Sequence, residues 1–450
     1  MAVGDFETRR LIVSRHWPGP SVLALNCGAV CIRCGRFRLL AVAKYDERYV
    51  IPKTHGEIGV SPMARQGAWA RTLGTVWPSL TYPAHVTLVT GAWPSRHGVL
   101  NNVAFDPLQH NEQHDWIWNA RDIKVKTLWD AARAAGVATG SVYWPVTVGA
   151  DIPWNFPQIW RARTDEDDRL LRSLAPAGVL SDSAALPAEH RTDRERLDAA
   201  LAILAKKRPG LLFVYFTDLD TIQHESGPMG TRAATTLGIT DGYVKELVAA
   251  AKAVSPRVAV ALVSDHGFVA VDAEIRPNVL LRREKLIEYG GRGKPERWDA
   301  YAWKAGGTAF VMARDPADAS MRARVRAIFD DAAKDPRSGI ARVYDGEEIA
   351  RRGGPPGAFV VLEARPGLVF SDAGDGPLVG PTPYRGHHGY APDMPEMKCS
   401  LFFWGDGVAR GVDLGDVAMV DVAPTIARLG GFTLDGADGK PLDRALAPAP

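Results

Sequence analysis

The chain has 450 residues, of which 46% are hydrophobic and 24% charged, and its formal net charge is +2. These proportions are ordinary for a soluble globular protein, and the length allows two or three domains or one large α/β core with insertions. The small net charge excludes a global field that would attract a nucleic-acid polymer, and no apolar run is long enough to span a bilayer. Because the first residues lack the apolar core of a signal peptide, we expect a cytoplasmic location.

Residues 1–62 differ in composition from the rest of the chain. Cysteine, arginine and tryptophan are scattered there without a period, and the stretch FRLLAVA (37–43) is strand-like. Cys27, Cys31 and Cys34 have a C-x3-C-x2-C spacing that could hold an iron–sulfur cluster. The flanks are arginine-rich and irregular and no cofactor-binding pattern follows, so we favour ordinary cysteines.

From about residue 63, predicted helices alternate with continuous apolar runs, which is typical of a mainly parallel sheet in an α/β protein. Such runs suit central strands that are buried on both faces. Gly136 ends the first of these helices, and Pro209-Gly210 ends the second. The predicted helices are 128–136, 194–210 and 241–254, and the predicted strands are 211–216 and 258–264.

Residues 270–380 are less regular than the segments on either side of them. A predicted helix at 321–334 is followed by Gly/Pro-rich sequence such as RRGGPPGAF. We expect an insertion or cap here, with substrate selectivity residing in it. Further on, residues 417–431 predict a helix that stops at glycine.

Two pairs of acid and histidine follow the two predicted strands. Asp220 and His224 are four residues apart, so both side chains can reach one ion, although a solvated acid and a surface histidine would give the same spacing. Asp265 and His266 directly follow a buried strand, where an acid is costly to bury unless it is paired or binds a metal. The carboxyl ends of such strands are where open α/β sheets bind ligands.

A threonine and a histidine pair complete the candidate site. Thr81 precedes the short helical stretch VTLVTG, where a threonine is either an N-cap or a nucleophile favoured by the helix N-terminus. His387 and His388 are flanked by glycines, whose backbone freedom lets an imidazole approach an ion. Carboxylates and imidazoles are zinc ligands, and a hydroxyl can accept a phosphoryl group. Together they predict a two-metal phosphoryl-transfer enzyme.

The order of these motifs resembles the alkaline phosphatase superfamily, specifically its nucleotide pyrophosphatase/phosphodiesterase (type I phosphodiesterase) branch. The resemblance covers about residues 63–435, and its blocks are SLTYPAH, LVTGAWPSRHGVLNN, DLDTIQHESGP, VSDHGF, GHHGYAPDMPEM and VDVAPTIARL. It implies a three-layer sandwich, with a mainly parallel central sheet, helices on both faces and an inserted cap region. Residues 63–450 would then form the catalytic domain, with its insertion at about 270–380.

The resemblance also implies an activity and the residues that carry it. The implied reaction is hydrolysis of a phosphodiester or pyrophosphate bond in a small phosphodiester or nucleotide substrate. Thr81 matches the nucleophile that becomes phosphorylated or nucleotidylated, and Asn102 matches a donor to a phosphoryl oxygen. Two divalent metal ions, zinc in the family, are implied as cofactors. The matched ligands are Asp220, His224 and His388 for one ion, and Asp265 and His266 for the other.

The sequence departs from the family pattern at its first strand. Family members have an Asp-Gly pair there whose Asp is a ligand of the nucleophile-side metal, and no such pair precedes Thr81. FRLLAVA (37–43) could be the corresponding strand, and Asp46 is then a candidate substitute ligand. We hypothesise that residues 1–62 are a disrupted form of the family's first βα unit, from a frameshift or a wrong start.

The leaving-group side of the site leaves alternatives open. Trp144, Trp154 and Phe156 could stack on a base or aryl group, or they could be core packing. An apolar, aromatic segment suits a diester, which carries one negative charge, so a diesterase is favoured over a phosphomonoesterase. A pseudoenzyme that has lost the first metal ligand is the alternative from a different class.

Overall fold

The computed structural model describes seven stretches of the chain, and the fold is reported for these alone: residues 28–30, 37–42, 66–110, 116–160, 165–176, 192–291 and 293–448. The cysteine motif Cys27, Cys31 and Cys34 lies outside the described residues, as does Asp46. Within the described stretches, no helix is long and apolar enough to cross a membrane.

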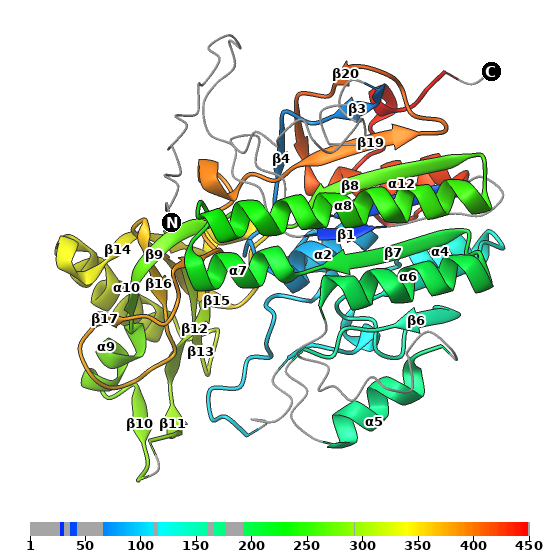
Figure 1. Ribbon diagram of the computed structural model, residues 1–450. Helices are drawn as coiled ribbons and strands as arrows, with labels where there is room; N and C mark the ends of the chain where they lie inside the picture. Colours follow the sequence, from blue (N-terminus) through cyan, green and yellow to red (C-terminus); the bar gives the residue numbers. More distant parts are fainter. Residues whose placement is uncertain are drawn as a thin grey trace, which may run out of the picture.

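A nine-stranded sheet forms the centre of a mixed α/β structure (Figure 1). Along one path its strands are ordered β20, β3, β19, β8, β1, β7, β5, β6, and β2 also pairs with β7 and β8. The strands are β1 (Gly28–Val30), β2 (Phe37–Val42), β3 (Ala68–Trp69), β5 (Thr139–Val142), β6 (Trp154–Phe156), β7 (Leu211–Phe216), β8 (Val258–Ser264), β19 (Leu401–Gly405) and β20 (Val412–Asp413).

The middle of this sheet is parallel, as the alternation of helices and apolar runs predicts. β2 is parallel to both β7 and β8, β5 is parallel to β7, and β6 is parallel to β5. β19 is antiparallel to β8 and β3, and β1 is antiparallel to β7 and β8. The predicted strands 211–216 and 258–264 are confirmed with the same bounds, and every residue in both is buried. The strand-like stretch near residue 37 is confirmed as β2.

Helices pack on the sheet in two groups. α6 (Asp193–Lys207) and α8 (Thr231–Val254) pack against one another, and Figure 1 shows them in front of the strands. α12 (Val422–Gly430) packs on α2 (Thr81–Thr90) and α4 (Leu128–Ala134) and lies behind β8 in that view. One hydrophobic core contains side chains of both groups and of the strands between them. Helices and strands therefore alternate along the sequence because the helices that pack on the sheet lie between its strands in the chain.

The predicted helices are present, with changes at their ends. α4 and α6 match their predicted segments closely, and a capping box starts each of them. α8 begins at Thr231 rather than at Asp241, because Ala233 and Leu237 bury their side chains against Leu219 of α7 (Asp218–Ser226). The predicted helix 417–431 is shortened at its start, where the chain forms strand β21 (Asp416–Ala418) before α12.

The region 270–380 is more regular than its sequence predicts. Its four-stranded sheet, ordered β12, β13, β15, β14, is antiparallel and has a hydrophobic core of its own. These strands are β12 (Ala300–Ala305), β13 (Thr308–Ala313), β14 (Ile340–Asp345) and β15 (Ala358–Ala364). The expected helix is present as α10 (Ala319–Lys334), which contacts β14 and β15.

The remaining elements are short or lie beside these sheets. β9 (Val269–Ile275) pairs with β16 (Gly367–Phe370), β17 (Val379–Pro381) and β18 (Gly386–His387). The others are β4 (Thr72–Gly74), α3 (Pro94–His97), α5 (Asp165–Leu174), α9 (Pro277–Arg283), β10 (Ile287–Tyr289), β11 (Pro295–Trp298) and α11 (Gly346–Arg351).

Candidate metal centre and nucleophile

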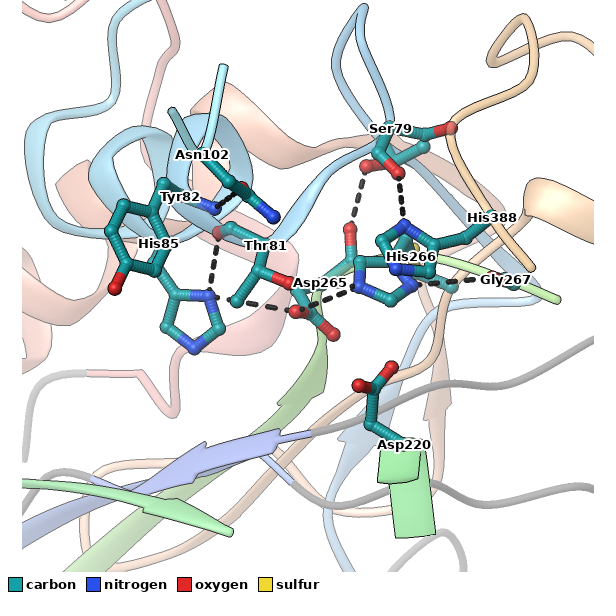
Figure 2. Close-up of polar contacts among 12 residues, drawn as sticks. Ser79, Thr81, Tyr82, His85, Asn102, Asp220, Asp265, His266, Gly267 and His388 are labelled. Atoms are coloured by element: carbon teal, nitrogen blue, oxygen red, sulfur yellow. Dashed lines mark hydrogen bonds and ion pairs between the residues drawn. The ribbon is translucent and has the colours of Figure 1, made fainter. Parts of the chain in front are cut away.

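Five candidate residues come from segments that meet at the carboxyl ends of β7 and β8. Asp220 lies in the first turn of α7, which follows β7, and Asp265 and His266 follow β8. His388 follows β18, and Thr81 begins α2. Figure 2 shows these side chains turned toward one another from elements far apart in the sequence. The sheet edge predicted to hold the site is therefore where they gather.

Asp220, His266 and His388 form a group that fits a metal ion. One ligand atom from each lies within 4.8 Å of the other two, and both histidines are buried. The rings of His266 and His388 stack with centroids 3.6 Å apart. One carboxylate and two imidazoles are a donor set typical of zinc. This group draws on both of the predicted ligand sets, because His266 was matched to one ion and the other two residues to the other.

Backbone carbonyls orient the imidazoles of this site. The Nδ1 of His388 is 3.1 Å from the carbonyl oxygen of Ser79, and the Nδ1 of His224 is 2.9 Å from that of Gly386. A carbonyl oxygen accepts but does not donate, so each Nδ1 carries the proton and each Nε2 keeps its lone pair for a ligand. Burial, with His266 close by, holds the pKa of His388 well below its usual value, which keeps this imidazole neutral as metal binding requires.

Thr81 lies directly beside the metal group. Its Oγ1 is 3.3 Å from Nε2 of His266, and its side chain is buried. Leu80 occupies the N-cap position of α2 and Thr81 is the first helical residue, so the N-cap alternative for Thr81 is wrong. The hydroxyl is thus turned toward the candidate ligands rather than toward the helix backbone (Figure 2).

Asp265 and His224 each lie close to one member of the metal group. Asp265 is fully buried, and its Oδ2 is 3.3 Å from Nε2 of His266. The Nε2 of His224 is 3.5 Å from Oδ2 of Asp220. The Nδ1 of His387 accepts a hydrogen bond from the N–H of His388 at 2.9 Å, so this atom is already engaged.

Asn102 is held next to the nucleophile by a backbone contact. Its Oδ1 accepts a hydrogen bond from the N–H of Tyr82 at 2.9 Å (Figure 2). The neighbouring Asn101 accepts from the Asn102 N–H at 2.7 Å and donates through Nδ2 to the carbonyl oxygen of Lys304 in β12 at 2.9 Å. The loop that carries Asn102 is therefore fixed both to α2 and to the smaller sheet.

The sequence reasoning missed His85, which lies one helical turn after Thr81. Its Nδ1 is 2.8 Å from the carbonyl oxygen of Thr81 and 3.5 Å from Oδ2 of Asp265. Burial lowers the pKa of His85 to about 3, so it is neutral at physiological pH. The i, i+4 spacing of Thr81 and His85 on one helix was the available signal.

The three aromatic candidates do not share a substrate-facing surface. Trp144 and Phe156 are fully buried in the main core, and Trp144 packs edge-on against His85 and Phe213. Trp154 is half-buried and packs on the same core. The core-packing alternative therefore describes Trp144 and Phe156, because a fully buried ring has no face to offer a base.

Comparison of the sequence with known proteins finds a matching family and similar relatives. The family model described as Type I phosphodiesterase / nucleotide pyrophosphatase matches residues 48–391. Human ectonucleotide pyrophosphatase/phosphodiesterase family member 1 is 26% identical over 223 residues, which are 46% of this chain and 21% of that protein. Human family member 7 is 24% identical over 295 residues, which are 61% of this chain and 59% of that protein. The chain thus covers a minor part of the first relative and just over half of the second.

Structural comparison finds the same family among solved structures. Murine ectonucleotide pyrophosphatase/phosphodiesterase 5, in an inactive form in complex with AMP, matches with a TM-score of 0.63 at 18% identity, over 89% of this chain and 96% of that one. The human protein of the same name matches with a TM-score of 0.60 at 16% identity, over 84% of this chain and 90% of that one. These likenesses show a common fold. Since the family model covers most of its length, this chain belongs to the type I phosphodiesterase/nucleotide pyrophosphatase family of the alkaline phosphatase superfamily.

Proposed function

We propose that this protein is a metal-dependent phosphodiesterase or nucleotide pyrophosphatase that uses Thr81 as its nucleophile. The observation that carries the proposal is the position of the Thr81 hydroxyl, 3.3 Å from Nε2 of His266 in a group that fits a metal ion. Family membership supports the reaction class. The AMP complex of the murine relative supports a nucleotide as the substrate class. We also infer that the sheet and its two helix groups correspond to the superfamily's three-layer sandwich.

The residues of the metal group fit one divalent ion of the kind that the family implies. Asp220, His266 and His388 would hold one ion between them, with His224 and Asp265 next to this group. The donor set of oxygen and nitrogen atoms favours zinc. A bound divalent ion would polarise the phosphoryl group and offset the negative charge that develops on it. We propose that a second ion completes the site.

The chain's own groups supply the nucleophile and its surroundings. The Thr81 hydroxyl would lose its proton and its oxygen would form a bond to phosphorus as the bond to the leaving oxygen breaks, and a proton would pass to the departing group in exchange. Water would then release the phosphorylated or nucleotidylated threonine and restore the hydroxyl. Asn102 is turned by its bond to the Tyr82 N–H so that Nδ2 remains as its donor, and this amide would stabilise charge on a phosphoryl oxygen.

The test compares Thr81→Ala and Thr81→Ser with the unaltered chain. Hydrolysis of bis-p-nitrophenyl phosphate and p-nitrophenyl phosphate would be measured alongside bound zinc. We expect faster cleavage of the diester, a loss of at least about 10³-fold in kcat for Thr81→Ala, and partial retention in Thr81→Ser, which keeps a hydroxyl. Zinc content should be the same in all three proteins.

Three results would contradict the proposal. Faster cleavage of the monoester would indicate a phosphomonoesterase. Full activity in Thr81→Ala would exclude Thr81 as the nucleophile. A pure, folded protein that binds zinc poorly and cleaves neither substrate would indicate a pseudoenzyme, the outcome expected if no residue replaces the missing Asp-Gly ligand.

A further inference from the structure

The start of α7 is capped by a residue from another helix. Thr217, at the N-cap position of α7, makes no side-chain capping bond of its own. Instead, the carboxylate of Asp193 accepts hydrogen bonds from the N–H of Thr217 at 2.7 Å and from the N–H of Asp218 at 3.0 Å. Backbone N–H groups at a helix start lack partners within the helix, so Asp193 supplies acceptors that α7 lacks.

The contact is reciprocal. Asp193 is the first residue of α6, and its own N–H donates to Oδ2 of Asp218 at 3.1 Å. The first residue of each helix thus caps the other helix. A shift of α7 relative to α6 would break these three hydrogen bonds together. The junction therefore holds the first turn of α7 in position.

A buried arginine fixes the Asp193 carboxylate in place. Arg196 has 1% of its surface exposed, and its Nη1 lies 2.5 Å from Oδ1 of Asp193. The same nitrogen donates to Oγ1 of Thr217, and the guanidinium lies 4.0 Å from the centroid of the Tyr143 ring, just past β5. The carboxyl ends of β5 and β7 are therefore joined through one ion pair.

Burying this ion pair is hard to explain by stability alone. Apolar residues of similar volume are often as stabilising as a buried ion pair, because two charges lose their hydration. The pair does provide direction, since both oxygens of Asp193 and the Nη1 of Arg196 have defined partners. Asp220, the carboxylate of the metal group, lies two residues after Asp218 in the same helical turn.

We propose that Asp193 and Arg196 are positioning residues for the metal centre, which hold the first turn of α7 so that Asp220 meets His266 and His388. The proposal rests on the proposed function only in taking that group as the site of a metal ion. Neither residue belongs to the metal group itself. They act on it through the backbone of Thr217 and Asp218.

The test is a neutral replacement of the pair, Asp193→Asn with Arg196→Met, which leaves no unpaired buried charge. We would measure zinc affinity by titrating metal-free protein, hydrogen exchange at the amides of residues 217 and 218, and Tm. We expect those amides to exchange at least about tenfold faster and zinc to bind about tenfold more weakly, in the range typical for groups that orient ligands. Tm should stay within a few degrees of the unaltered protein.

Arg194→Gln is the matched control. Arg194 is on the same helix and pairs with Asp198 and Glu246, but these pairs are exposed and do not reach α7. The zinc affinity of the Arg194→Gln variant and its hydrogen exchange at the amides of residues 217 and 218 should equal those of the unaltered chain. Thr217→Val is the milder second variant, because it removes one acceptor of Arg196 and keeps the pair of Asp193 and Arg196. If the double variant fails to fold, a weaker zinc affinity in Thr217→Val supports the proposal.

Zinc affinity within about twofold of the unaltered protein in a folded variant would overturn the proposal, since about tenfold is expected. So would a lower Tm with the zinc affinity of the folded protein unchanged, which is the result of a purely structural role. None of these measurements uses a substrate. If the unaltered chain cleaves no diester, the proposed function fails while zinc affinity and exchange still decide the role of Asp193 and Arg196.

Discussion

At the scale of single residues, substitutions of Asn102 test the stabilisation of phosphoryl charge separately from metal binding. Its Oδ1 is engaged by the Tyr82 N–H, so the amide donor is the atom available to a phosphoryl oxygen. We expect Asn102→Ala to lower kcat/KM for a diester by about 10²- to 10³-fold, the usual cost of removing one such donor. Asn102→Asp keeps the acceptor for Tyr82 but replaces the donor with a negative charge, and should be at least as impaired. An active Asn102→Asp enzyme with normal zinc content would refute this role.

Single residues also mark the limit of what the sequence predicts. Asp220 and His266 were predicted as ligands because acids and histidines after apolar strands are chemically conspicuous, and His388 because the flanking glycines let an imidazole approach an ion. His85 was missed because its i, i+4 spacing from Thr81 indicates proximity alone, while its contact with Asp265 depends on how α2 lies against the end of β8. Trp144 shows the reverse problem. An aromatic side chain looks the same in a sequence whether it faces a ligand or, as here, the core.

At the scale of elements, the β12–β13 hairpin supports the loop that carries His388. The N–H of Gly307 donates to the carbonyl oxygen of His388 at 2.9 Å. Gly306 has a φ of +71°, and a Cβ added there would lie 2.0 Å from that same oxygen. We expect Gly306→Ala to displace the loop, to weaken zinc binding about tenfold and to destabilise the protein by more than about 1 kcal/mol. Zinc titration and urea unfolding would measure the two effects.

Gly136→Ala is the control for backbone strain. Gly136 has a φ of +69°, but an added Cβ would have no neighbour within 4 Å. The left-handed conformation should therefore cost about 1 kcal/mol in both variants, while zinc affinity should fall only in Gly306→Ala. Equal zinc affinity in the two variants would mean that the hairpin does not position His388.

Elements differed in how far they could be predicted. β7 and β8 were predicted to the residue, because a strand buried on both faces is a continuous apolar run with abrupt ends. β12 and β13 were missed, although AYAWKA and TAFVMA are also apolar, because the irregular, Gly/Pro-rich sequence of the region indicated only an insertion or cap. The start of α8 was misplaced because its first turns are stabilised by packing on α7 rather than by a capping signal.

At the scale of the whole molecule, the site depends on both sheets. β7 and β8 of the larger sheet lead into Asp220, Asp265 and His266, and the smaller sheet contacts the segments that carry His388 and Asn102 through Gly307 and Lys304. The sequence predicted the first relation, since motifs followed strands directly. It could not predict the second, because pairing between sheets is set by contacts between residues far apart in the chain. The role expected for the insertion, substrate selectivity, stays a prediction.

Acid should destabilise the whole molecule through histidines that are buried in the neutral form, and His97 is the clearest case. The His97 Nδ1 accepts from the N–H of Val99 at 3.2 Å, and its Nε2 lies 3.1 Å from Oγ1 of Thr87, whose own hydroxyl donates to the carbonyl of Ala92. A proton on Nδ1 would break the first of these bonds. Burial, the main cause, lowers the pKa of His97 from 6.5 to about 3.

The sign of the effect follows from this depressed pKa. Below pH 6.5 the unfolded chain takes up a proton at residue 97 that the folded protein does not, so stability is present above that pH and is lost as the pH falls toward 3. Between pH 7.5 and pH 5 this one group should cost about 2 kcal/mol of the free energy of unfolding. Urea unfolding of the unaltered chain and of His97→Gln at both pH values would measure it. His97→Gln should be less stable at pH 7.5 but should lose about 2 kcal/mol less on acidification, and an equal loss in both proteins would show that His97 does not set the acid sensitivity.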